Sequence, residues 1–286
     1  MEVSTSGLIL AADAAIDLQM HTIYSDGIWE PMQLVEYLAN ERFALVAVTD
    51  HDRLDATADI QLLAARRRLP VLPAVEMTTQ WRGKPTNLLC YNFGPEHQRL
   101  QTLCEQVLQR QRENIQSVYA ALRRRGYQFP RQEEVLHLSG GEPLQVRDMF
   151  LLLQEHGYGT LDLPVWRILV EAGLRQETNS ILEVTEAAHQ AGAICILAHP
   201  GRNDITLFSE PMLNQLRHDV PIDGIEVYYP LHTAEQQAMY LAYARKHNIL
   251  ISAGSDTHTP DRKPVKYRAE LCRDLLERVG ITVTVP

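Results

Sequence analysis

Residues 44–76 read ALVAVTDHDRLDATADIQLLAARRRLPVLPAVE. Two short apolar runs, Ala44–Thr49 and Pro70–Val75, lie near the ends of this segment, and a helical pattern over Ala56–Arg67 separates them. The runs are apolar almost throughout instead of alternating with polar residues, which is typical of strands that are covered on both faces. The order strand, helix, strand therefore predicts a parallel α/β sheet or barrel.

The same alternation extends over most of the chain. Further strand-like runs are Ala14–Leu18, Asn87–Asn92, Ala193–Ala198, Gly224–Val227, Asn248–Ser252 and Ile281–Val285, and further helical patterns are Glu30–Asn40, Ile181–Gln190 and Thr233–Lys246. The pattern is interrupted between about residues 96 and 180, where Gln, Arg, Glu and Leu predominate and a long helix is expected over Glu96–Arg125. We therefore expect an α/β domain formed by residues 14–95 and 181–286, with a mainly helical insertion formed by residues 96–180.

The composition is that of a folded protein with an acidic surface. Hydrophobic residues make up 45% of the 286 residues and the formal net charge is −9, so neither a disordered chain nor extended wrapping of duplex DNA is expected. A small anionic substrate is compatible with this charge if metal ions or arginines reverse the local field. The four cysteines are far apart in the sequence and predict buried free thiols. No apolar run of about 18 residues is present, so we expect a cytoplasmic protein that binds neither a membrane nor long nucleic acid.

Polar and charged residues follow one expected strand after another. They are Asp17, Gln19, His21 and Asp26 after the first strand, Asp50, His51 and Asp52 after the second, Glu76 after the third, His199 and Arg202 after the fifth, and Asp256 and His258 after the seventh. Each motif alone is more commonly a turn or a helix cap. Their repetition at the carboxyl ends of five strands, where such folds place their sites, indicates a metal centre. Imidazole and carboxylate ligands without thiolate suit Mn²⁺, with Fe²⁺ or Zn²⁺ as alternatives, and their number predicts two to three ions.

In this order the motifs resemble those of the PHP superfamily, which is named after polymerase and histidinol phosphatase. The family's opening motif, Asp-Leu-His-x-His-Thr-x-x-Ser-Asp-Gly, is similar to residues 17–27, DLQMHTIYSDG. The later family motifs are similar to Thr49–Asp52, Val75–Glu76, Ala198–Arg202 and Gly254–His258. The resemblance covers roughly residues 16–94 and 181–260. It implies an α/β fold, a distorted (β/α)7 barrel with a trinuclear metal site and a mainly helical inserted subdomain.

The resemblance also implies how the ligands share three ions. The first ion would take Gln19, His21, Glu76 and Asp256, the second Glu76, Asn87 and His199, and the third Asp26, His51 and His258. The chain departs from the family pattern at two positions, because Gln19 stands where the family has His and Asn87 stands where related enzymes have His. An amide oxygen is a neutral ligand and a weaker one than imidazole for Zn²⁺ or Fe²⁺, so the second ion is affected most.

Three residues are expected to take part in catalysis. Glu76 would be the metal ligand that two ions share, and His199 would assist the leaving group. Arg202 would bind the substrate phosphate, because a planar guanidinium matches phosphate with two parallel hydrogen bonds. Arg147, in the insertion, has two interpretations: a second phosphate contact or a solvated charge on a helix. We expect Asp17 and Asp50 to orient the ligand histidines. His232 is a further candidate for assisting the leaving group.

These residues predict a metal-dependent phosphoesterase, a hydrolase that acts on phosphoric ester bonds. The expected substrate is a phosphate monoester of a small nucleotide, either AMP or a 3′,5′-nucleoside bisphosphate, or the 5′ end of a short RNA from which nucleotides are removed. The amides at positions 19 and 87 leave open an alternative, a degenerate PHP protein that binds metal or nucleotide without turnover. A third interpretation, a proofreading or repair module of the kind attached to DNA polymerases, fits the acidic charge least well.

Overall fold

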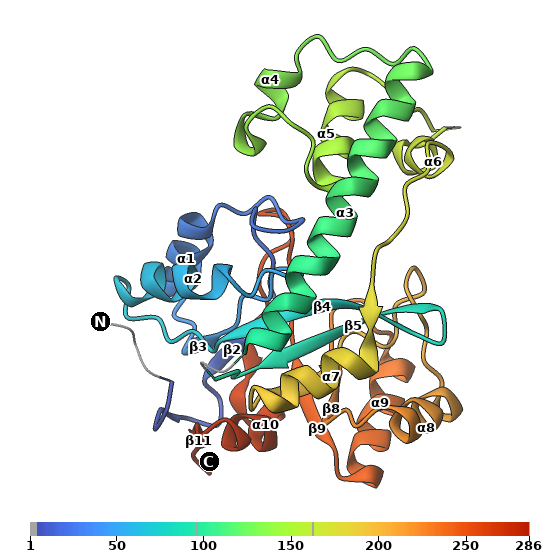
Figure 1. The fold of residues 1–286 in the computed structure, drawn as a ribbon. Helices are drawn as coiled ribbons and strands as arrows, with labels where there is room; N and C mark the ends of the chain where they lie inside the picture. The colour runs from blue at the N-terminus through green and yellow to red at the C-terminus, as the bar shows by residue number, and fades with distance from the viewer. Residues whose placement is uncertain (1–4, 95–96, 162, 286) are drawn as a thin grey trace. The chain divides into compact units, whose positions relative to one another are not determined.

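The computed structural model describes residues 5–94, 97–161 and 163–285. It confirms a mixed α/β chain with a central sheet and surrounding helices (Figure 1). Contacts between Cα positions divide the chain into two compact units, Met1–Cys104 with Thr178–Pro286, and Glu105–Glu177. The strands belong to the first unit, and the described part of the second is helical.

The strands form three sheets. The largest has the order β6 (Asn179–Ser180), β4 (Ala74–Trp81), β5 (Lys84–Tyr91), β7 (Ile194–Leu197), β8 (Gly224–Tyr228) and β9 (Leu250–Ala253). The second has the order β10 (Tyr267–Arg268), β2 (Ala15–Asp17) and β3 (Leu45–Val46), and in the third β1 (Ile9–Leu10) pairs with β11 (Thr282–Val283). Each strand expected from the sequence has a counterpart here, and β1, β6 and β10, each of two residues, were not expected.

Three isolated parallel bridges connect the two larger sheets. Met20 pairs with Thr257, Val46 with Val71, and His51 with Glu76. The bridges extend β2, β3 and β9 beyond their regular ends, into the segments that carry the expected polar residues. These segments are consequently held side by side.

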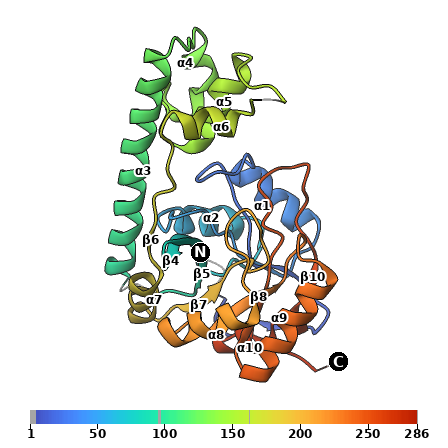
Figure 2. The ribbon, with the colours of Figure 1, turned by 90° about the vertical axis from the view of Figure 1, so that its right-hand side faces the viewer.

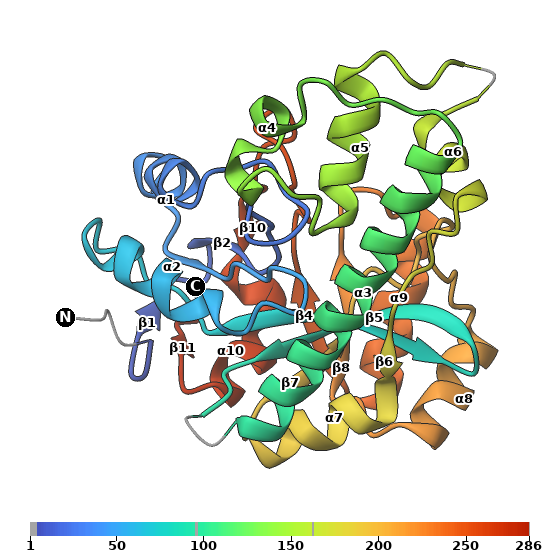
Figure 3. The same cartoon turned by 45° about the horizontal axis from the view of Figure 1, so that its top comes forward.

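The expectation of a wholly parallel sheet is wrong. β5 is antiparallel to both β4 and β7, and β10 is antiparallel to β2, whereas the other described strand pairs are parallel. β4 and β5 form a long hairpin (Figure 3) around a two-residue turn, Arg82 and Gly83, in which both residues have positive φ, 50° and 74°. This turn matches the twist of antiparallel strands. Arginine is an unusual residue at positive φ, so its residue type carries no clear turn signal.

Alternation along the hairpin places polar side chains inside the fold. Val75 and Met77 of β4 belong to one apolar cluster, whereas Leu89 of β5 belongs to a second cluster on the opposite face of the sheet. Successive residues of a strand point to opposite faces. Glu76 and Asn87 therefore lie on the same face of the sheet as the second cluster, where both side chains are buried.

Helices surround the strands of the first unit. α1 (Pro31–Asn40) follows β2 and α2 (Ala56–Ala65) follows β3, and Figure 2 shows α7 (Ile181–Gln190), α8 (Glu210–Asp219), α9 (Ala234–His247) and α10 (Arg273–Arg278) together beside the strands. Residues 98–171 contain α3 (Gln98–Arg124), α4 (Gln132–Val135), α5 (Val146–Glu155) and α6 (Val165–Glu171). The core of the second unit includes Leu122, Leu152 and Leu169. The expected start of the long helix, Glu96, lies outside the described residues.

The four cysteines are free and buried, as predicted. Within the described ranges, no helix combines the length and the apolar character that crossing a membrane requires.

His189, at the end of α7, is expected to make stability depend on pH. Its Nε2 atom lies 2.8 Å from Asp223 Oδ2. Interactions with Cys195 and Asp223 raise the pKa of His189 to about 9, although burial opposes the shift. A raised histidine pKa stabilises the folded state below the unfolded pKa of about 6.5, and this contribution is lost as the pH rises through about 9.

We therefore expect His189→Asn to lower the urea midpoint of unfolding more at about pH 6 than at about pH 10. The exposed His218 offers a control, because His218→Asn should change the midpoint little at either pH. An effect of His189→Asn that is equal at both pH values would contradict the assigned ion pair.

Candidate metal centre

The predicted ligands come from the ends of neighbouring strands. Gln19 and His21 follow β2, His51 follows β3, and Glu76 lies within β4. The bridge from His51 to Glu76 and the bridge from Met20 to Thr257 hold these segments next to the residues that follow β9. We divide the ligands into an inner ligand group, which consists of Gln19, His21, Glu76, Asn87, His199 and Asp256, and an outer ligand group, which consists of Asp26, His51 and His258.

His21, Glu76 and Asp256 are buried together. His21 Nε2 lies 2.9 Å from Glu76 Oε2 and 3.2 Å from Asp256 Oδ1. Despite these distances, neither ring nitrogen of His21 has an aligned hydrogen bond within the described part of the chain. Ligand atoms of all three residues lie within 4.8 Å of one another. A nitrogen and two carboxylate oxygens that converge this closely are the arrangement expected around a cation.

The outer ligand group adjoins His21 and is partly exposed. Asp26 Oδ2 lies 3.3 Å from His258 Nε2 and 4.0 Å from His51 Nε2, and Asp26 Oδ1 lies 3.7 Å from His21 Nδ1. The imidazole of His21 stacks on those of His51 and His258, at centroid distances of 4.8 and 4.3 Å. Three imidazoles and one carboxylate thus offer a further ion position beside the inner one.

Two other inner ligands, His199 and Gln19, contact Glu76. His199 Nε2 lies 2.9 Å from Glu76 Oε1, and Gln19 Nε2 donates a hydrogen bond of 2.8 Å to Glu76 Oε2. Asn87 is buried in β5, opposite Thr78 of β4. Both oxygens of Glu76 therefore face predicted ligands, as a carboxylate shared by two ions requires.

Carboxylates and imidazoles stabilise each other's charged forms here. Burial alone would raise the pKa of Glu76, but His51 and His199 hold this pKa well below its ordinary value. Burial is likewise outweighed at Asp256, where contact with His21 lowers the pKa to about 2. Asp256 and Glu76 in turn raise the pKa of His21 well above its ordinary value, although burial lowers it. Divalent cations can take the place of these protons, so the residues fit the metal ions expected from the sequence.

Arg202 joins the buried ligands to the surface. Its Nη1 donates to Asp256 Oδ2 at 3.3 Å, and the hydroxyl of Tyr229 donates to the same oxygen at 3.0 Å. Arg202 Nε donates to Asp204 Oδ1 at 3.0 Å, and 24% of the Arg202 side chain is exposed. The predicted phosphate-binding residue is thus in contact with a predicted metal ligand while remaining accessible to a substrate.

Glu226 is a site residue that the sequence analysis missed. It lies fully buried in β8, where its Oε2 accepts a hydrogen bond of 2.9 Å from the backbone N–H of His199. Burial raises the pKa of Glu226 well above its ordinary value. His199 has a φ of 26°, a conformation that costs about 1–3 kcal/mol in a residue other than glycine, and the bond from Glu226 helps to hold it. An acidic residue inside the apolar run Gly224–Val227 was the available signal.

Asp17 and Asp50 act on the backbone of ligand-bearing segments. Asp17 Oδ1 accepts a hydrogen bond of 2.9 Å from the N–H of Ser255, next to Asp256. Asp50 Oδ1 accepts bonds of 2.7 Å from the N–H of Thr22 and from the hydroxyl of Ser25. The two aspartates are therefore placed to orient the ligands through the turns that carry them.

His232 and Arg147 are the remaining residues to which the sequence assigned a role. His232 Nε2 accepts from the N–H of Gly201 at 3.1 Å and His232 Nδ1 donates to the carbonyl of Val227 at 3.0 Å, so both nitrogens bind backbone groups. Arg147 lies in the second unit, at the start of α5, with only 11% of its side chain exposed and Nη2 3.7 Å from Asp148 Oδ1. Its guanidinium lies beside a carboxylate of the same helix.

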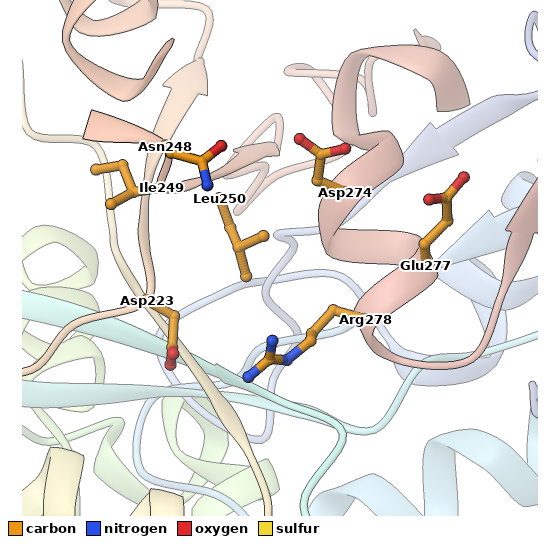
Figure 4. Close-up of a pocket in the computed structure, with 7 residues that line it drawn as sticks. All are labelled: Asp223, Asn248, Ile249, Leu250, Asp274, Glu277 and Arg278. Carbon is orange, nitrogen blue, oxygen red and sulfur yellow. The ribbon is translucent and has the colours of Figure 1, made fainter. Parts of the chain in front are cut away.

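A separate pocket of about 420 Å³ lies near the start of β9 and is shown in Figure 4. Asp223, Asp274, Glu277 and Arg278 contribute its charged lining. Members of the inner and outer ligand groups do not line it. The pocket is therefore distinct from the candidate metal centre.

Known proteins with similar sequences include a phosphatase and exoribonucleases. The 3′,5′-nucleoside bisphosphate phosphatase of Chromobacterium violaceum is 25% identical over 254 residues, which cover 86% of this chain and 88% of that protein. The 5′-3′ exoribonuclease Rnm of Escherichia coli is 27% identical over 252 residues, which cover 85% of each chain. No family model matches the chain.

A solved structure supports the fold. A protein of Bifidobacterium adolescentis that is assigned as a metal-dependent phosphoesterase superposes with a TM-score of 0.75 at 22% identity, covering 93% of this chain and 96% of that one. At this level of identity the likeness shows that the two chains share a fold.

Proposed function

We propose that this chain is a PHP-type metal-dependent phosphoesterase that hydrolyses a phosphate ester of a small nucleotide. The observation that carries the proposal is the convergence of His21, Glu76 and Asp256, which adjoin a second group around Asp26. The activities named for the similar sequences, bisphosphate phosphatase and exoribonuclease, agree with this chemistry.

The fold proposed with this function is a distorted (β/α)7 barrel. Its seven strands would be β2, β3, β4, β5, β7, β8 and β9. Three observations support the ring: the pairings within the two larger sheets, the bridges from Val46 and His51 to the β4 segment, and the hydrogen bond from the N–H of Leu18 to the carbonyl of Ala253. Such a ring would collect the strand ends at one mouth of the barrel.

Two to three divalent ions, with Mn²⁺ as the first candidate, would be held by the inner and outer ligand groups. Bound ions of this kind neutralise the phosphoryl oxygens and lower the pKa of water towards about 7. Glu76 keeps the ligands of neighbouring positions together, because its two oxygens contact different imidazoles. Arg202 binds the substrate phosphate, which takes the place of the carboxylates of Asp204 and Asp256 on the guanidinium.

The proposed substrate is small. A net charge of −9 disfavours a long polyanion, whereas one or two phosphate groups can be matched by metal ions and arginine. AMP and 3′,5′-nucleoside bisphosphates meet this requirement, and the 5′ end of a short RNA is a close variant. We assign Arg147 as a second phosphate contact, which makes Arg147→Ala the variant to compare with Arg202→Ala.

The substrate class is tested by measuring kcat/KM under Mn²⁺ for AMP, adenosine 3′,5′-bisphosphate and a short 5′-phosphorylated RNA. We expect release of inorganic phosphate from the mononucleotides with a higher kcat/KM than release of nucleotides from the RNA. Faster degradation of RNA would identify the exoribonuclease variant. Confirmed metal binding without turnover of any of the three substrates would instead favour the degenerate metal-binding protein. The contact that motivates this alternative is the hydrogen bond from the Gln19 amide to Glu76.

A further inference from the structure

Two buried amide oxygens of the inner ligand group have no hydrogen-bond donor among residues 5–94, 97–161 and 163–285. They are Gln19 Oε1 and Asn87 Oδ1. Gln19 is fully buried and Asn87 is 4% exposed, so bulk water does not reach either side chain freely. A buried carbonyl oxygen without a donor is costly, and within a polar cluster it is evidence for an ion.

The Gln19 amide contacts Glu76, and Asn87 is bonded through its backbone to the segment that carries His199. Gln19 Nε2 donates to Glu76 Oε2, and because the amide offers nitrogen at one end and oxygen at the other, its free oxygen belongs to the same cluster. The backbone oxygen of Asn87 accepts from the N–H of Ala198, the residue directly before His199. His199 Nε2 in turn lies 2.9 Å from Glu76 Oε1.

The inner ligand group is consequently rich in oxygen. Four of its six members, Gln19, Glu76, Asn87 and Asp256, offer oxygen, and the other two offer imidazole nitrogen. The outer ligand group has two imidazoles and one carboxylate. Carbonyl and carboxylate oxygens suit Mg²⁺ and Mn²⁺, whereas imidazole suits Zn²⁺ and Fe²⁺.

We propose that Gln19 and Asn87 are metal-selectivity residues, which lower the preference of the inner positions for Zn²⁺ and make them sites for Mn²⁺ or Mg²⁺. The outer position keeps the Zn²⁺ affinity that its imidazoles give. This inference rests on the metal-dependent function proposed above, but it concerns which ion is bound and not whether an ester is hydrolysed.

The test measures metal binding directly, without a substrate. Protein stripped with EDTA is dialysed against Mn²⁺, against Zn²⁺, and against mixtures of the two, and bound metal is counted by mass spectrometry. The spectrum of bound Mn²⁺ is recorded by electron paramagnetic resonance. The variants are Gln19→His with Asn87→His, His51→Ala to remove an outer ligand, and Gln106→His, which adds an exposed imidazole on α3 as the control.

We expect the wild type and Gln106→His to share one ratio of Zn²⁺ to Mn²⁺ affinity at the inner positions. His51→Ala should keep Mn²⁺ at the inner positions and lose bound Zn²⁺, so that its ratio of bound Zn²⁺ to bound Mn²⁺ falls. The double variant should raise the ratio of Zn²⁺ to Mn²⁺ affinity at the inner positions at least about tenfold. A ratio of bound Zn²⁺ to bound Mn²⁺ that does not fall in His51→Ala would overturn the inference, whether or not the double variant folds. An unchanged affinity ratio in a folded double variant would do the same.

The outcome is separable from a failure of the proposed function. Because metal affinities are measured without substrate, esterase activity with either metal does not change the result on metal selectivity. Absence of esterase activity in a protein that still binds Mn²⁺ selectively would contradict the phosphoesterase and support the selectivity residues.

Discussion

Glu76→Gln is expected to lower kcat for phosphate release by about 10³-fold, which corresponds to about 4 kcal/mol of transition-state stabilisation. Glu76 has both oxygens in contact with predicted ligands, His21 and Gln19 at Oε2 and His199 at Oε1. Glutamine keeps the shape but removes the negative charge and one oxygen. The bound metal per chain should fall together with kcat, and both are measured on the same preparation.

Glu226→Gln is the matched comparison for this experiment. Glu226 is equally buried, but burial raises its pKa, whereas the pKa of Glu76 is lowered, and Glu226 Oε2 accepts one backbone hydrogen bond. Glutamine can make that bond. We expect a loss in kcat of less than about tenfold. Equal losses from the two substitutions, or more than a tenth of wild-type activity in Glu76→Gln, would contradict the assigned role of Glu76.

Arg202→Ala is expected to lower kcat/KM by about 10²-fold while bound metal stays unchanged. Charge-assisted, forked hydrogen bonds to phosphate contribute about 1.5–3 kcal/mol, and alanine removes them. The hydroxyl of Tyr229 still donates to Asp256 in the variant, so this metal ligand remains held. Arg202→Lys keeps the positive charge but loses the fork, and should recover only part of the lost kcat/KM.

Arg67→Ala is the control for charge, because Arg67 is exposed and pairs with Glu36 on the surface. It should leave kcat/KM and metal content unchanged. If Arg202→Ala instead lowers the metal content in proportion to activity, Arg202 acts by positioning Asp256 and does not bind the phosphate.

Local sequence patterns were sufficient for the alternation of strands and helices. The near-continuous apolar runs and the three- and four-residue periodicity of helices such as α7 indicate, from the residues of each segment alone, which side chains are buried. The antiparallel β4–β5 hairpin was missed because its turn depends on the backbone of Arg82, a residue whose type does not demand positive φ. The strand order depends on pairings between distant segments, which no local pattern contains.

The site divides in the same way. Its histidines and aspartates were found because they follow strand ends in a repeated order. Glu226 was missed because it lies inside a strand, where one acidic residue among apolar neighbours resembles an outward-facing position. Which buried oxygens have no donor within the described part of the chain, those of Gln19 and Asn87 among them, depends on every neighbouring group in three dimensions. The sequence identified the two amides as departures, and only the structure shows that no described residue donates to their oxygens.

The most direct test of the central claim is release of inorganic phosphate from adenosine 3′,5′-bisphosphate by EDTA-stripped protein, measured before and after Mn²⁺ is added, with Asp256→Asn measured in parallel. Asp256 is suited to this comparison because it contacts His21, Tyr229 and Arg202 at once. We predict that release appears only after Mn²⁺ is added and is lost in the variant. Release by the stripped protein in EDTA, undiminished release by Asp256→Asn, or no release by the Mn²⁺-loaded wild type would contradict the account.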